Sequence, residues 1–159
     1  VIKSITSTDD VAILRLIGGD IGKKPGIIAK ISGILSDKNI NIKSILTSQT
    51  TINFLLSQKN FVKAKELLEQ EKLLAIEALE SRTRISLIAV VGVGINSHKG
   101  IFSKIFRVLA RQNINIEIVS QGASDAAAYI IVKREDKNKA IQAIHRELFK
   151  EECNPCEAC

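Results

Sequence analysis

The sequence predicts an α+β protein built from two similar units, each an antiparallel sheet with its helices on one face. The tetrapeptide Asn-Ile-Asn-Ile occurs at 39–42 and again at 113–116, an offset of 74 residues. The match extends backwards, from "PGIIAKISGIL" at 25–35 to "KGIFSKIFRVL" at 99–109. In both copies the apolar pattern changes between strand and helix periodicity in the same order, so the repeat covers a whole structural unit.

The first unit begins with a buried strand at 11–19, because "VAILRLIGG" is apolar and β-branched and stops at two glycines. From Gly26 the apolar residues recur at helical spacing, which predicts a helix of about three turns. Two tightly joined strands follow at 40–49 and 51–57, then a helix at 61–71 and a final strand at 72–80, whose alanines and glutamates also permit a helix. This order of elements is that of the ferredoxin-like βαββαβ fold.

The second unit repeats the order but stops one strand short. It comprises a strand at 84–94, a helix at 100–111, strands at 114–121 and 126–133, and a helix at 137–149. Because an open sheet edge is normally covered or paired, we expect the leftover segment 1–7 to supply the missing strand. The first domain (9–80) is then inserted in the second (1–8 plus 81–150), and 151–159 is expected to be a disordered tail.

Composition argues against several classes of protein. The net charge is +6, but lysines and arginines are interleaved with acids, and aromatic residues make up only 4% with a single Tyr. Platforms for stacking bases are therefore scarce, so we expect no nucleic acid as partner. No apolar run approaches the length that spans a membrane, and no signal pattern precedes the first strand, so we expect a cytoplasmic protein. The chain starts at Val1 and contains no Met, and we expect it to be a piece of a longer protein.

No catalytic or metal-binding group is predicted. Cys153, Cys156 and Cys159 have the spacing of part of a metal or iron–sulfur motif but lack a fourth ligand. His98 and His145 have no nucleophile beside them, and the chain contains neither a P-loop nor a dinucleotide fingerprint.

The turn "GGDIGKKPG" at 18–26 has the chemistry of a site for a small amino acid. The first N–H groups of the helix that follows have no internal partners, and with the helix dipole they suit a carboxylate. Gly22 and Gly26 allow a ligand to approach the main chain, and Asp20 can accept an α-ammonium group. Strand alternation places Asn41 and Lys43 on the face opposite Ile42, while Asn39 and Asn113 are expected to end helices in the left-handed conformation.

Together these features resemble the tandem ACT domains of aspartate kinases. The resemblance rests on the glycine turn, the helix that opens on Pro-Gly or Lys-Gly, both "NINI" segments, "VVGVGINSHKG", "SQGAS" and "AIHRELF", and it covers about 1–149. Ile95 stands where the family commonly has Met. The resemblance implies regulation by an amino acid of the aspartate pathway, a homodimer formed through the ACT domains, and a catalytic kinase domain in cis. ATP and Mg belong to that kinase domain, so no cofactor is expected in this chain.

Carried over residue by residue, the resemblance implies effector contacts at the start of the helix and along the strand after it. With the residues argued above, the expected effector site is Asp20, Ile21, Gly22, Gly26, Ile27, Ile28, Asn41, Ile42, Lys43, Thr47, Ser48 and Gln49. The alignment follows the lysine-inhibited class. Lys43 and Gln49, however, replace carboxylates of the family pattern, and this charge difference favours threonine.

A possible second site, weaker than the first, is expected at the matching places of the second copy. Its residues are Asn96, Ser97, Gly100, Ile101, Asn115, Ile116, Gln121 and Ser124. Two other functions remain open: an ACT-type module of another enzyme or a stand-alone ACT protein, and a KH-like RNA-binding module that uses the "GKKPG" loop.

Overall fold

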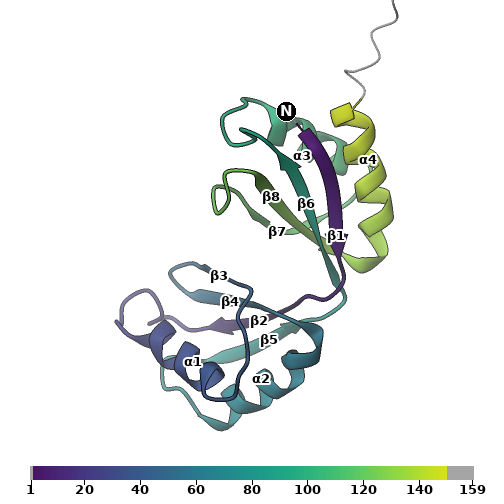
Figure 1. The fold of residues 1–159 in the computed structure, drawn as a ribbon. Coiled ribbons are helices and arrows are strands. Elements are labelled where there is room, and N and C mark those ends of the chain that lie inside the picture. The colour runs from purple at the N-terminus through teal and green to yellow at the C-terminus, as the bar shows by residue number, and fades with distance from the viewer. Residues whose placement is uncertain (1, 150–159) are drawn as a thin grey trace, which may run out of the picture. The chain divides into compact units, whose positions relative to one another are not determined.

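The computed structural model describes residues 2–149, and the expectations for 150–159 with its three cysteines lie outside that range (Figure 1). The chain divides into two compact units at Asp9/Asp10 and Arg84/Ile85, so that residues 10–84 form one unit and the described residues on either side form the other. The predicted insertion of the first domain in the second is confirmed.

The unit of residues 10–84 contains six elements in the predicted order. They are β2 (Ala12–Ile17), α1 (Ile27–Ser36), β3 (Ser44–Thr47), β4 (Thr51–Leu56), α2 (Gln58–Gln70) and β5 (Ala78–Arg82). The strands form an antiparallel sheet of order β3-β4-β2-β5, which leaves β3 and β5 at the edges.

The other unit repeats this plan, with its first strand in sequence at the sheet edge. It comprises β1 (Ile2–Thr8), β6 (Ile85–Gly92), α3 (Ile101–Arg111), β7 (Ile116–Ser120), β8 (Ala127–Lys133), a 3-10 turn (Arg134–Asp136) and α4 (Lys137–Phe149). The sheet order is β1-β6-β8-β7. Segment 2–8 therefore supplies the fourth strand, pairing antiparallel with β6, as predicted.

Strand register explains the core of the first unit. Ala12 lies opposite Leu56, Leu14 opposite Phe54, and Leu16 opposite Ile52. Because alternate residues share a face, these six side chains form one apolar surface. Both helices pack on it, α1 through Ile31 and Leu35 and α2 through Phe61, Ala64 and Leu68.

Both "NINI" segments begin with the predicted helix stop. Asn39 and Asn113 adopt φ of 54° and 56°. In the first copy the Asn39 N–H bonds to the Ser36 oxygen at 2.9 Å, and the Ile40 N–H bonds to the Leu35 oxygen at 3.0 Å. This is the Schellman arrangement, and the second copy repeats it at Asn113 and Ile114. Ile40 is buried in the core with Leu35, which fixes the path of the chain into β3.

The predicted strand at 72–80 is wrong over its first six residues. The chain reverses after α2 at Lys72, whose φ is 42°, and a turn bond joins the Ile76 N–H to the Leu73 oxygen at 2.9 Å. Leu73 and Ile76 pack on the core as parts of this turn, so their apolar character does not indicate a strand. Main-chain bonding to β2 begins with the Glu77 N–H and the Ile17 oxygen, at 2.7 Å. The expected domain boundary at residue 80 falls inside β5.

Candidate functional site

The loop between β2 and α1 lies against the end of the β3–β4 hairpin. The Gly18 N–H donates to the Thr50 oxygen at 2.9 Å, and the Gly22 N–H donates to the Gln49 oxygen at 2.8 Å. A Cβ placed at Gly22 would lie 2.8 Å from that oxygen. Gly22 therefore lets the hairpin main chain approach, which is a structural role. The structure thus brings the loop residues together with Gln49, which follows Thr47 and Ser48 at the end of the hairpin.

The N-terminus of α1 opens on this loop without a side-chain cap. Its N-cap residue, Gly26, has φ of 83°, and no acidic residue occupies the first turn. The unpaired N–H groups and the positive end of the helix dipole can therefore receive an external carboxylate. Ile28, in the same turn, is 40% exposed and can contact an apolar part of a ligand, whereas Ile21 is buried in the core and anchors the loop.

Asp20 is the acidic side chain of this loop. Its carboxylate pairs with the Lys24 ammonium at 2.9 Å, and this hydrogen bond holds the pKa of Asp20 below its ordinary value. Both side chains are about half exposed, so the pair contributes little to stability and a ligand ammonium can displace Lys24.

Asn41, Ile42 and Lys43 lie at the opposite end of β3. Asn41 and Ile42 line a hollow of about 480 Å³ together with Ser32, Ser36, Asn39 and Ile40 from the end of α1. Asn41 is exposed and Ile42 half-buried, in keeping with the predicted alternation. No residue of loop 18–26 contributes to this hollow.

Lys43 has a counter-ion that the sequence did not indicate. Its ammonium lies 3.3 Å from the Asp10 carboxylate and also donates to the Asp10 carbonyl. The other carboxylate oxygen of Asp10 accepts the N–H of Gln58, the first residue of α2, at 2.9 Å. The Gln58 N–H and the Lys43 ammonium hold the pKa of Asp10 below its ordinary value. Asp10 lies 33 residues from Lys43, and no periodic pattern links them.

The predicted effector residues thus form two groups in one chain. The loop group comprises Asp20, Ile21, Gly22, Gly26, Ile27, Ile28, Thr47, Ser48 and Gln49. The strand-start group comprises Asn41, Ile42 and Lys43. Three residues of β3, Ser44–Leu46, lie between Lys43 and Thr47, which are therefore about 13 Å apart at about 3.3 Å per residue.

The second copy shows the same division. The Asn96 side-chain amide donates to the Ser124 oxygen at 2.8 Å, next to α3. The Asn96 Oδ1 is buried without a partner among the described residues. Gly100, with φ of 85°, is the N-cap of α3 and again no side chain caps the helix. Ser97 and Ile101 flank Gly100 in this loop and first turn, and Gln121 is exposed beyond β7, whereas Asn115 and Ile116 lie at the start of β7.

Over residues 2–149, no group of three or more His, Cys, Asp or Glu side chains could hold a metal ion. Within the same residues, no helix is both long and apolar enough to cross a membrane.

Comparison with known proteins defines the class to which this fold and these loops belong. Residues 6–70 and 88–148 each match the ACT domain family. The regulatory subunit of aspartate kinase from Thermus thermophilus, solved without ligand, superposes with a TM-score of 0.82 at 26% identity, covering 93% of this chain and 99% of that one. The chain belongs to the ACT domain family and corresponds to the tandem ACT regulatory region of aspartate kinases.

Two further relatives are longer than this chain. The bifunctional aspartokinase/homoserine dehydrogenase of Buchnera aphidicola is 30% identical over 155 residues, which cover 93% of this chain and 19% of that protein. E. coli aspartokinase III, solved in complex with lysine and aspartate in the T-state, gives a TM-score of 0.76 at 25% identity, covering 93% of this chain and 33% of that one. The chain therefore spans a third or less of these two proteins.

Proposed function

We propose that the chain is the effector-binding part of an aspartate kinase, which senses an end-product amino acid and shifts an attached kinase domain between active and inactive arrangements. The observation that carries the proposal is the uncapped N-terminus of α1, which opens beside Asp20 in an ACT fold. It offers N–H donors for a carboxylate next to an acceptor for an ammonium group. ATP and Mg would act on the attached kinase domain, in the cytoplasm, and this chain would bind neither.

The effector site is completed by a second copy of the chain. Among the described residues 2–149, β3 is hydrogen-bonded on one side only, to β4, so half of its backbone N–H and C=O groups face an open edge. Antiparallel pairing of β3 with its counterpart would place the loop group of one copy beside the strand-start group of the other. Ile45, 38% exposed on β3, would become buried in that interface.

Calorimetric titration of the chain with L-lysine and with L-threonine tests the proposal. We expect one of them to bind with one site per chain, because the second copy lacks an acidic residue in its loop. Asn41→Ala should weaken binding by about tenfold or more. Asn115→Ala, the matching change in the second copy, should leave binding unchanged. Binding of neither amino acid would contradict the proposed function, and two sites per chain would contradict the weaker second copy.

Light scattering at micromolar concentration tests the dimer. We expect a homodimer that Ile45→Lys converts to a monomer with loss of effector binding, because a charge on an edge strand opposes pairing. Val119→Lys is the control, since Val119 is 41% exposed on β7, an edge strand of the other sheet. A monomeric wild-type chain, with and without amino acid, would overturn the pairing.

A further inference from the structure

Two connections join the first unit (10–84) to the second, and both leave it at the same end of its sheet. The ladder between β1 and β6 in the second unit ends at Thr8, opposite Leu87. The ladder between β2 and β5 in the first unit begins at Ile13, opposite Arg82. Each connection therefore consists of the four residues between these ladders, 9–12 in one and 83–86 in the other. The contacts of these residues decide how firmly each connection is held.

In the first unit, Gln58 holds both connections. This residue is half-buried at the first position of α2, and its side-chain amide donates to the Val11 oxygen at 2.7 Å and to the Thr83 oxygen at 2.8 Å. An amide group has two N–H donors, so both are used. Gln58 thus bridges the two connections just beyond the end of the ladder between β2 and β5.

Asp10 joins Gln58 to Lys43, a residue of the strand-start group. One oxygen of the Asp10 carboxylate accepts the main-chain N–H of Gln58 at 2.9 Å, and the other lies 3.3 Å from the Lys43 ammonium. The side chain of Ser57, the N-cap residue of α2, makes no capping bond, so the Asp10 carboxylate caps this helix from 48 residues away. A chain of contacts therefore runs from Lys43 through Asp10 and Gln58 to both connections.

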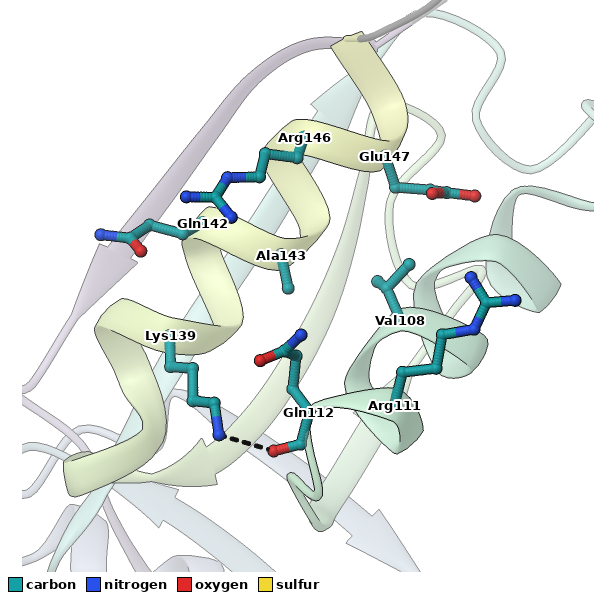
Figure 2. A pocket seen from close by; sticks show the side chains of 8 residues that line it. All are labelled: Val108, Arg111, Gln112, Lys139, Gln142, Ala143, Arg146 and Glu147. Atoms are coloured by element: carbon teal, nitrogen blue, oxygen red, sulfur yellow. Dashed lines mark hydrogen bonds between the residues drawn. The ribbon is translucent and has the colours of Figure 1, made fainter.

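The second unit holds the neighbouring residue, Asp9. The Lys137 ammonium, at the start of α4, donates to the Asp9 carboxylate at 2.8 Å. The same turn of α4 is tied to the end of α3, because the Lys139 ammonium donates to the Gln112 carbonyl at 2.8 Å (Figure 2). Asp9 and Asp10 are adjacent in the chain, and each is fastened within its own unit. A displacement of Asp10 therefore acts directly on a residue that is bound to the second unit.

The pair of Lys43 and Asp10 is the part of this chain of contacts that an effector can alter. The Lys43 side chain is 33% exposed and the Asp10 side chain 58%, so a ligand can reach both. An ammonium group would compete with Lys43 for the Asp10 carboxylate, and a carboxylate group would compete with Asp10 for the Lys43 ammonium. Because an exposed ion pair contributes little free energy, a bound effector can replace either partner.

We infer that Asp10 and Gln58 are positioning residues that couple effector binding at Lys43 to the two connections between the units. This inference rests on the proposed effector function. A ligand shifts a conformational equilibrium only through contacts that differ between two states. The two states here are Lys43 paired with Asp10 and that pair broken by the effector. The coupling then follows hydrogen bonds and ion pairs that are continuous in the structure.

The test is NMR titration of the ¹⁵N-labelled chain with L-lysine and with L-threonine. The main-chain N–H of Ile28, in the first turn of α1, reports occupation of the effector site. The side-chain amide of Gln58 reports the state of the connections, and the spectrum of Gln58→Ala identifies its signals by their loss. We expect one of the two amino acids to shift both reporters along the same saturation curve.

Three variants test the path of the coupling at saturating effector. Asp10→Asn removes the ion pair with Lys43 but keeps an oxygen that can accept the Gln58 N–H, and the shift of the Gln58 amide should become at least about twofold smaller. Lys43→Met breaks the same pair from its other side and should reduce the shift equally. Glu66→Gln is the control, because it removes a carboxylate from an exposed position of α2 outside this chain of contacts, and it should keep the wild-type shift.

The outcomes separate this inference from the proposed function. If neither amino acid shifts either reporter, the proposed function and the inference both fail. A shift of Ile28 without a shift of the Gln58 amide would leave effector binding in place and overturn the coupling. An undiminished Gln58 shift in Asp10→Asn would also overturn it, as would an equal loss in Glu66→Gln, which would indicate a diffuse effect of charge. Circular dichroism of all variants checks that the fold is retained.

Discussion

Replacing Gly22 by alanine should destabilise the first ACT unit, whereas the same replacement at Gly33 should stabilise it. A Cβ at Gly22 would lie 2.8 Å from the Gln49 oxygen and 2.9 Å from its Cα, closer than real Cβ atoms approach a main chain. The loop must then move away from the hairpin and lose the hydrogen bond from Gly22 to Gln49. Such overpacking costs about 1–3 kcal/mol, and a lost hydrogen bond costs about 1 kcal/mol.

Gly33 is the matched control because it lies in α1 of the same unit, and a Cβ there meets nothing within 4 Å. Alanine should gain about 0.5–1 kcal/mol at this position, since glycine is a poor residue for a helix interior. The free energies of unfolding should therefore differ by about 2.5–5 kcal/mol between the two variants. Urea denaturation followed by circular dichroism measures this difference. Equal stability of the two variants would refute the close-packing role of Gly22.

Two further predictions concern a helix end and pH. Asn39→Val should lower the free energy of unfolding by about 1–2 kcal/mol, because φ of 54° disfavours a β-branched residue, whereas Asn39→Gly should be tolerated; equal urea midpoints for both variants would contradict this. The Lys137 and Ser86 side chains hold the pKa of Asp9 below its ordinary value of 3.8. Its stabilisation should therefore be complete above about pH 5 and be lost as the pH falls through the folded pKa, and Asp9→Asn should flatten that acid limb in thermal melts.

The fold could be predicted from the sequence because its information is local and periodic. Apolar spacing distinguishes strands from helices, the repeat defines the unit twice, and each left-handed Asn marks a helix end. The turn at 72–77 could not be predicted, because Leu73 and Ile76 pack against the core as apolar residues of a strand would.

The arrangement of the candidate site could not be predicted from the sequence either. Residues 41–43 and 47–49 were all expected on one strand at 40–49, yet they lie at the opposite ends of β3. Which residues meet depends on the pairing of β3 with a neighbour, and the sequence of one chain does not describe that pairing.

The choice between lysine and threonine as effector depends on the charge at position 43. From the sequence, Lys43 should repel the ε-ammonium of a bound lysine. In the structure the Asp10 carboxylate lies 3.3 Å from the Lys43 ammonium, so the position presents a neutral pair. Charge repulsion at position 43 therefore argues less strongly against lysine as the effector than the substitution alone indicates. The alignment with the lysine-inhibited class then favours lysine.

Lys43→Asp should consequently raise the affinity for lysine by about tenfold or more, because two carboxylates would face the ε-ammonium where a lysine side chain now occupies one of them. The affinity for threonine should change little, since its side chain carries no charge that the added carboxylate could attract. Lys43→Gln is the control: it frees Asp10 without adding a carboxylate and should give a smaller gain. Calorimetry with both amino acids on the three proteins measures the effect. Unchanged lysine affinity in both variants would place Lys43 outside the effector site. The loop at the N-terminus of α1 would then determine which amino acid binds.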